Sequence, residues 1–173
     1  MTLYILAQLV GFLGYGFHIS APYFKTQQQI MKVGLIGLVL LCLQWFLLNQ
    51  MSLVAFNLLL ILTTCLALGK YEEKQTQQQL MLVLQIFGLT IILSVSQGNV
   101  IDILAMIAFS LSVISRFSES ITNFRLYAGI AGILLSICGA MAMAMPALLF
   151  NAIYAIMHFY YLSTMHHDRA HAT

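Results

Sequence analysis

The sequence predicts an all-α integral membrane protein with seven transmembrane helices in a 3+1+3 parallel-repeat bundle. Three observations predict this fold: apolar runs of helical length, cations confined to alternate connections, and a partial match of the chain to itself after a shift of 94 residues. Of 173 residues, 61% are hydrophobic and 7% are charged, and the mean hydropathy is +0.94. Soluble domains carry about 25% charged residues, so the composition is typical of a membrane protein.

The apolar runs place the helices, because a spanning helix needs about 20 apolar residues. The first run lacks a basic n-region and a cleavage site, and Gln8 and His18 interrupt it, so we interpret it as a span rather than a signal peptide. The whole chain, 1–173, then forms one membrane domain with a cytoplasmic tail at 165–173. The predicted spans are Leu3–Ile19, Val33–Leu48, Met51–Gly69, Leu80–Ser96, Val100–Ser115, Leu126–Met145 and Pro146–Thr164.

The positions of the cations predict the orientation of the chain. All seven Lys and Arg fall in the first, third and fifth connections or in the tail, and the second, fourth and sixth connections contain none. Short cytoplasmic loops hold the Lys and Arg of a membrane protein, so we expect the N-terminus outside and the C-terminus in the cytoplasm. Six or eight spans would break this segregation. The cations are Lys25, Lys32, Lys70, Lys74, Arg116, Arg125 and Arg169.

Internal similarity predicts that the chain contains two copies of a three-helix unit. A shift of 94 residues places Met51–Asn57 on Met145–Asn151, so the third span aligns with the seventh. The same register continues without a gap through the second and sixth spans. The Phe-Asn pair and the ungapped register carry the argument, because matches between Leu and Ile are common in so apolar a chain.

The predicted units are 3–69 and 100–164, joined by a linker helix at 80–96. A single linker span returns the chain across the membrane, so both units run in the same direction and are related by an axis along the membrane normal. The polar stretch 69–79, rich in glutamine, would connect the first unit to the linker.

Asn57 and Asn151 are the first candidate substrate-binding residues, because polar side chains within spans face the bundle interior or a wet cavity. They occupy equivalent positions in the two units, so the predicted axis would bring them face to face. A facing pair of amides can bind the hydroxyl, amide or carboxyl groups of a small polar molecule. The alternative is that each amide hydrogen-bonds a neighbouring helix and only holds the bundle together.

Four further residues extend the predicted site. Tyr154 and His158 follow Asn151 at about one and two helical turns and share its face. His158 could carry a proton, or it could be a satisfied interior histidine. Gln44 and Trp45 would close the cavity from its outer side, although a tryptophan near a helix end is also typical of the membrane interface.

Several functional classes are excluded by the residues present. We find no Ser-His-Asp set, HExxH motif, phosphate loop or paired carboxylates within spans, so we expect no enzyme, no catalytic residue and no cofactor. Cys42, Cys65 and Cys138 lie in apolar runs without metal-ligand spacing, so we expect no metal site. A net charge of +2 gives no basic surface for nucleic acid.

Three features carry a resemblance to a known family: the stretch Leu6–Gly11, the pairs Phe56-Asn57 and Phe150-Asn151, and the 3+1+3 plan. In these features the chain resembles the YgjV family of bacterial inner-membrane proteins. That family looks like a distant relative of the SWEET, SemiSWEET and PQ-loop transporters. The resemblance implies a multi-pass protein of the bacterial inner membrane, with a SWEET-like fold and a central site reached by alternating access. Asn57 and Asn151 match the positions of the asparagines in SWEET-like pockets.

The chain also departs from the SWEET pattern. Trp45 corresponds to a tryptophan of such pockets, but Gly139 stands at the equivalent place in the second half. The prolines that act as hinges in SWEET helices are missing, since this chain has only Pro22 and Pro146. Glycines would have to provide the hinges instead.

These observations lead to one main hypothesis about function and two competing ones. The main hypothesis is a transporter or facilitator of a small polar metabolite, embedded in the lipid bilayer, either as a monomer or as a homo-oligomer. The alternative is a non-transporting scaffold or accessory subunit, whose polar residues only hold helices together. A haem protein that uses His18 and His158 is a third hypothesis, which the absence of a Soret band would exclude.

Overall fold

The computed structural model describes the backbone of residues 2–69 and 74–170 and the side chains of 2–69 and 75–164. These residues form seven α-helices and one short 3-10 helix, and no strand occurs within the described ranges. The seven predicted helices are therefore present. The elements are α1 (Thr2–Ser20), η1 (Ala21–Tyr23), α2 (Gln27–Leu47), α3 (Met51–Ala67), α4 (Lys74–Ser94), α5 (Val100–Arg116), α6 (Ile121–Met141) and α7 (Met145–Ala170).

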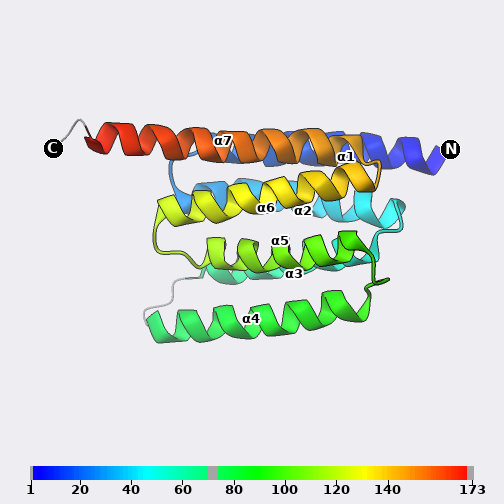
Figure 1. Cartoon of the computed structure of the whole chain (residues 1–173), viewed down its shortest axis with the longest axis horizontal. Coiled ribbons are helices and arrows are strands. Elements are labelled where there is room, and N and C mark those ends of the chain that lie inside the picture. Colours follow the sequence, from blue (N-terminus) through cyan, green and yellow to red (C-terminus); the bar gives the residue numbers. More distant parts are fainter. Residues whose placement is uncertain (1, 70–73, 171–173) are drawn as a thin grey trace.

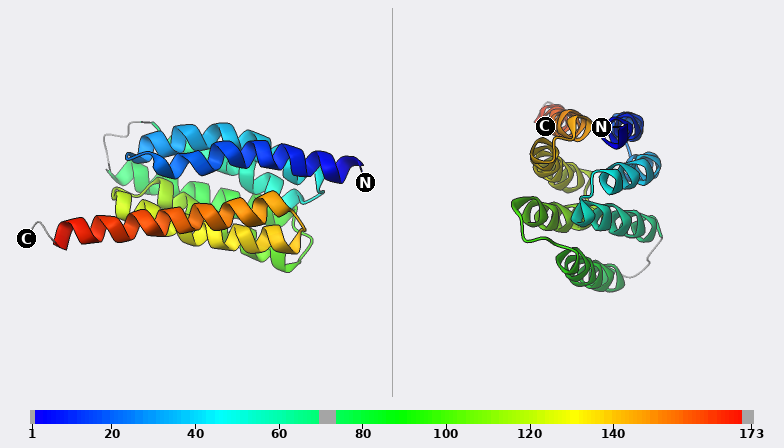
Figure 2. Two further views of the ribbon diagram at one scale, coloured as in Figure 1. Left: turned by 90° about the horizontal axis from the view of Figure 1, so that it is seen from above. Right: turned by 90° about the vertical axis from the view of Figure 1, so that its right-hand side faces the viewer.

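The helices lie nearly parallel to one another in two stacked files (Figures 1 and 2). In the first file α2 packs between α1 and α3, and in the second file α6 packs between α5 and α7. The files meet where α1 contacts α7 and where α3 contacts α5. Helix α4 lies beyond this second contact and packs against both α3 and α5, as the end-on view in Figure 2 shows.

Five helical segments are long and apolar enough to cross a membrane: α1 with η1, α2, α4, α6 and α7. Helices α3 and α5 have 17 residues each, which makes them about 25 Å long. Both lie inside the bundle, between α4 and the other helices (Figure 1). The chain is therefore a multi-helix membrane protein.

Four helices extend five or six residues beyond their predicted bounds, and α2 and α6 do so by beginning at Gln27 and Ile121. Helix α4 begins at Lys74, so residues 75–79, predicted to be part of a connection, are helical. Lysine and glutamine are good helix formers, which explains why a polar composition does not interrupt the helix. Helix α7 continues to Ala170 through much of the predicted tail 165–173, because no Gly or Pro follows Pro146.

The packing is that of a protein whose solvent is lipid. Large apolar side chains such as Leu13 and Ile156 are 64% and 66% exposed, whereas His158 in the interior is fully buried. Because lipid tails are apolar, outward-facing leucine and isoleucine cost nothing in a membrane, and polar groups turn inward. The buried polar and charged side chains are Gln44, Ser52, Asn57, Thr63, Thr64, Asp102, Ser112, Ser115, Arg125, Ser136, Asn151 and His158.

The turns after α2 and α6 have the same construction. Asn49 has φ 57° and Met143, 94 positions later, has φ 52°, so both turns use a left-handed residue. In the first turn the Gln50 amide donates to the carbonyl of Trp45, and in the second the Ala144 amide donates to the carbonyl of Gly139. Every residue of the second turn lies 94 positions after its equivalent in the first.

The beginnings of α2 and α6 also correspond at this spacing. The side chain of Thr26 caps α2 and that of Ser120 caps α6. Each helix then runs for 21 residues from positions that are again 94 apart.

Candidate functional site

Two small cavities adjoin each other in the centre of the bundle, between the two files. Each has a volume of about 20 Å³, which holds about one water molecule. We name them the Trp45 cavity and the Arg116 cavity. The Trp45 cavity is lined by Tyr15, His18, Leu38, Leu41, Trp45, Phe56, Asn57, Leu60, Leu135 and Asn151. The Arg116 cavity is lined by His18, Leu60, Ser112, Arg116, Ala128, Ala131, Gly132, Leu135, Asn151 and Tyr154.

The structure brings the two predicted asparagines together on one cavity. Asn57 on α3 and Asn151 on α7 both line the Trp45 cavity, and each is 2% exposed. Asn151 also lines the Arg116 cavity, so its side chain lies between the two spaces. The two asparagines therefore reach the same central space from different files.

The two asparagines form different hydrogen bonds. Asn151 donates from Nδ2 to the hydroxyl of Tyr15 on α1 over 2.9 Å, whereas Asn57 donates to the carbonyl of Leu53 on its own helix over 2.7 Å. The residue 94 positions after Tyr15 is Phe109, which has no hydroxyl to accept a bond. The difference between the two sides therefore follows from one residue type on the facing helix.

Of the residues predicted to close the site, Trp45 lines a cavity and Gln44 does not. Trp45 is 2% exposed and its ring forms part of the wall, so it is not a lipid-facing interface anchor. Gln44 is fully buried against α1, at a point where a Cβ on Gly11 would overlap its side chain. Neither atom of the Gln44 amide group has a hydrogen-bond partner among the described residues.

Tyr154 and His158 occupy different places relative to the cavities. Tyr154 lines the Arg116 cavity, and the ring of His158 lies behind it at 4.4 Å, edge to face. His158 also contacts the ring of Phe124 at 5.9 Å, and neither of its ring nitrogens has a described partner. His158 is thus adjacent to the site but does not line either cavity.

His18 lines both cavities, although it is not among the residues predicted to bind substrate. Its ring stacks on that of Tyr154 at 4.5 Å and meets that of Tyr15 edge to face at 6.3 Å. The residue 94 positions after His18 is Ser112, which lines the Arg116 cavity from α5. This correspondence is a sequence signal that could have identified both residues.

Arg116 is the second residue of the site that sequence reasoning missed, because it was interpreted as a loop cation. It ends α5, but its side chain folds back along the bundle. Nε donates to the hydroxyl of Thr64 over 2.6 Å and Nη1 donates to the carbonyl of Ser112 over 3.0 Å. The guanidinium therefore lines a central cavity from a helix end.

Arg125 has a structural role by contrast. It is 3% exposed, and it donates to the carbonyls of Pro22 and Phe24. These two hydrogen bonds hold η1 against α6. Its guanidinium carbon also lies 4.7 Å from the ring centre of Tyr161. Arg125 does not line either central cavity.

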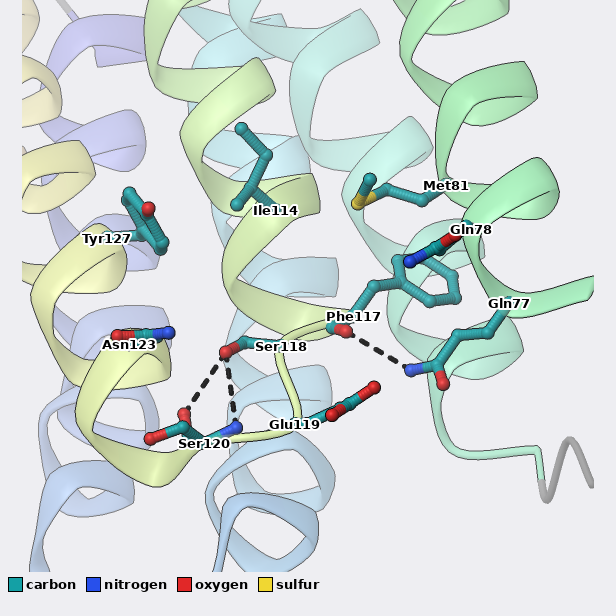
Figure 3. A pocket seen from close by; sticks show the side chains of 10 residues that line it. All are labelled: Gln77, Gln78, Met81, Ile114, Phe117, Ser118, Glu119, Ser120, Asn123 and Tyr127. Carbon is teal, nitrogen blue, oxygen red and sulfur yellow. Dashed lines mark hydrogen bonds between the residues drawn. The ribbon is translucent and has the colours of Figure 1, made fainter. Parts of the chain in front are cut away.

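A larger polar cleft of about 400 Å³ lies between α4, the connection from α5 to α6, and α6 itself (Figure 3). Its volume is in the range of small-molecule sites. Gln77 donates to the carbonyl of Phe117 across one side, and Ser118 donates to the carbonyl of Ser120 at the base. None of the six predicted site residues lines it. The lining residues are Gln77, Gln78, Met81, Ile114, Phe117, Ser118, Glu119, Ser120, Asn123 and Tyr127.

One charged group far from the cavities also has a clear structural role. Asp102 caps α5 at the end of the bundle opposite Arg116, where it accepts hydrogen bonds from Ser96 and from the amides of Gln97 and Asn99. Across the described part of the chain, no three side chains of His, Cys, Asp or Glu gather in a metal-binding arrangement.

The family model Imp-YgjV, described as a bacterial inner membrane protein, matches residues 5–169, which is nearly the whole chain. No curated protein and no solved structure matches the chain.

Proposed function

The chain belongs to the Imp-YgjV family of bacterial inner membrane proteins, and we propose that it is a carrier or facilitator of a small polar solute in that membrane. Asn57 and Asn151 would bind the solute between the two files. The observation that carries this proposal is their convergence on one buried cavity from helices of different files. Trp45, Tyr15 and His18 line the same cavity, together with apolar side chains.

We further propose that the two files are fused copies of one three-helix unit, with α4 as the linker. In support, the turns after α2 and α6 and the caps of both helices recur at a spacing of 94 residues. An axis along the helices would exchange α1 with α5, α2 with α6 and α3 with α7. The same axis exchanges the two contacts between files, α1 with α7 and α3 with α5.

The proposed orientation has seven spans, the N-terminus outside and the C-terminus in the cytoplasm. In support, the described cations fall at one end of the bundle, near the ends of α1, α5 and α7 and the beginnings of α2, α4 and α6. We call this the basic end. Lys70 lies outside the described residues. Short loops rich in Lys and Arg face the cytoplasm.

Transport requires the files to move relative to each other, because each central cavity holds only about one water molecule. The helices of each file are tightly joined at glycines, as where a Cβ on Gly37 of α2 would lie 2.8 Å from the carbonyl oxygen of Gly14 of α1. Each file would therefore move as a unit, which is the rocking expected of repeat-built transporters.

The competing function is a scaffold or accessory subunit whose buried amides only join helices. We propose no enzymatic reaction and no cofactor for the central site. Lipid is the proposed surrounding partner, with homo-oligomerisation as a further expectation.

The test is a thermal-shift screen of the purified full chain against a library of small polar metabolites. A ligand that binds only the folded state at 100 times its Kd adds about 2.7 kcal/mol of stability. We expect a solute that raises the Tm of the unchanged protein and loses this effect in the double variant Asn57→Leu, Asn151→Leu.

Thr63→Val serves as the matched control. Thr63 is fully buried and bonds the carbonyl of Leu59, but it lines neither cavity. A solute whose effect survives in the double variant would refute the site. If the double variant lowers the Tm and no solute shifts the unchanged protein, the scaffold function is favoured.

A further inference from the structure

We infer that the solute is a small carboxylate, and that Arg116 binds its carboxylate group. This inference rests on the proposed function, because it assigns a chemical class to the solute of the same central site. The Arg116 cavity shares His18 and Asn151 with the Trp45 cavity, so a solute held by the asparagines lies beside the guanidinium.

The hydrogen bonds of Arg116 leave donors for a ligand. A guanidinium has five N–H groups in a planar fork. Nε donates to Thr64 and Nη1 donates once to Ser112, while Nη2 has no partner among the described residues. One N–H of Nη1 and both of Nη2 therefore have no described partner, which leaves the edge between these two nitrogens for a ligand. That edge matches the two oxygens of a carboxylate.

The charge of the central site also favours an anion. Among the described side chains, no carboxylate lines either cavity. Asp102 belongs to the opposite end of the bundle, and Glu119 lines the polar cleft. A cation within a membrane bundle is costly unless an opposite charge or other polar groups compensate it. Thr64 and Ser112 supply only a hydroxyl and a carbonyl.

No group that contacts the ligand edge would oppose an anion. The other polar groups on the Arg116 cavity are His18, Tyr154, Ser112 and Asn151, and none carries a permanent negative charge. The nearby guanidinium of Arg125 is bound to the carbonyls of Pro22 and Phe24 but adds to the positive potential. The site therefore attracts an anion and repels a cation.

The small size of the two cavities favours a ligand of few heavy atoms, which the site would admit as the files move apart. The two cavities hold about one water molecule each and meet at Asn151. A carboxylate in the Arg116 cavity would place a short polar substituent in the Trp45 cavity, beside Asn57. A short hydroxy acid has this arrangement of groups.

The first experiment compares charged and neutral probes of similar size. The Tm of the purified full chain is measured in sodium glycolate and sodium acetate, and in the neutral glycolamide and acetamide, at constant sodium and ionic strength with sodium chloride as the reference. We expect the carboxylates to raise the Tm and the amides to leave it unchanged. An equal effect of the amides, or no carboxylate effect beyond that of chloride, would overturn the inference.

The second experiment uses variants of the two buried arginines. Arg116→Gln should weaken apparent glycolate affinity about tenfold or more, since it removes a charge-assisted hydrogen-bonded pair. Arg116→Lys should retain a weaker response, because a point charge cannot form the fork. Arg125→Lys is the matched control and should keep the full response. An undiminished response in Arg116→Gln would overturn the inference.

Uptake of radiolabelled glycolate into proteoliposomes separates this inference from the proposed function. If glycolate binds in a manner that depends on Arg116 but is not taken up, transport is refuted and the carboxylate site is supported. If uptake of a neutral solute depends on Asn57 and Asn151 but not on Arg116, the carboxylate assignment is refuted and the carrier function is supported. If Arg116→Gln does not fold, Arg116→Lys and the comparison of acids with amides on the unchanged protein decide the question.

Discussion

The amide nitrogen of Asn151 donates to the hydroxyl of Tyr15 across the contact between α7 and α1, over 2.9 Å. This bond joins the two files at the wall of the Trp45 cavity. The equivalent contact between α3 and α5 contains Phe109 in place of Tyr15, and there the rings of Phe56 and Phe109 pack edge to face at 6.1 Å. At these equivalent positions the contact is therefore polar between α1 and α7 and apolar between α3 and α5, whereas elsewhere in the second contact Arg116 of α5 bonds Thr64 of α3.

Replacing Tyr15 with Phe should destabilise the protein. The change removes the acceptor of the Asn151 amide and leaves a buried donor without a partner, at a cost of about 1 kcal/mol for a bond between helices in a membrane. Thermal unfolding in detergent measures this effect. Tyr160→Phe is the control, because Tyr160 is 62% exposed. Equal Tm values for the two variants would contradict the role of the bond.

Replacing Gly37 with Ala should also lower the Tm. The added Cβ would lie 2.8 Å from the carbonyl oxygen of Gly14 and 3.1 Å from the backbone nitrogen of His18, so α1 and α2 would have to separate. Such overpacking costs about 1–3 kcal/mol. Gly16→Ala is the matched control on α1, since a Cβ there meets no atom within 4 Å and alanine favours a helix. A stable Gly37→Ala variant would show that this contact is not tight.

Replacing Met143 with Gly should raise the Tm. Met143 has φ 52°, where a side chain costs about 1 kcal/mol that glycine avoids. Its carbonyl, which accepts bonds from Tyr4 and Gln8, is retained in the variant. The reciprocal variant Asn49→Ala should lower the Tm, because asparagine tolerates the left-handed conformation better than alanine does. Unchanged stability in both would argue against strain in these turns.

The orientation can be tested by labelling single cysteines in cells. After Cys42, Cys65 and Cys138 are replaced with Ser, cysteine is introduced at Gln97 or at Glu119, which are exposed at opposite ends of the bundle. With the outer membrane permeabilised, an impermeant thiol reagent should label the Gln97→Cys protein and label Glu119→Cys only after lysis. The reverse pattern would place the basic end outside.

Much of the helical plan could be predicted from the sequence, because lipid imposes a length and an apolar composition on each span. The start of α3 at Met51 is the predicted one, and α7 begins at Met145, one residue before its predicted start. The start of α4 could not be predicted in this way, because a hydropathy pattern does not distinguish a polar helical turn from a polar loop. The helical preference of residues 75–79 is a separate property of their side chains.

The candidate site could be predicted only in part. The position of Asn57 and Asn151 on an interior cavity could be predicted, because a polar side chain in the middle of a span is turned away from lipid. Arg116 was missed, because its position at a helix end says nothing about the direction of its side chain. That direction depends on the hydroxyl of Thr64, which α3 supplies from the other file. Gln44 was placed on the cavity, but Gly11 allows it to pack against α1 instead.

Helix α4 makes the bundle unequal at its two edges. It contacts both α3 and α5, whereas no eighth helix among the described elements bridges α1 and α7 (Figure 2). A motion that separates the files meets an additional packed helix at one edge and none at the other. The files would then hinge at the edge covered by α4 and separate first at the edge formed by α1 and α7. The bond between Tyr15 and Asn151 would have to break for this separation.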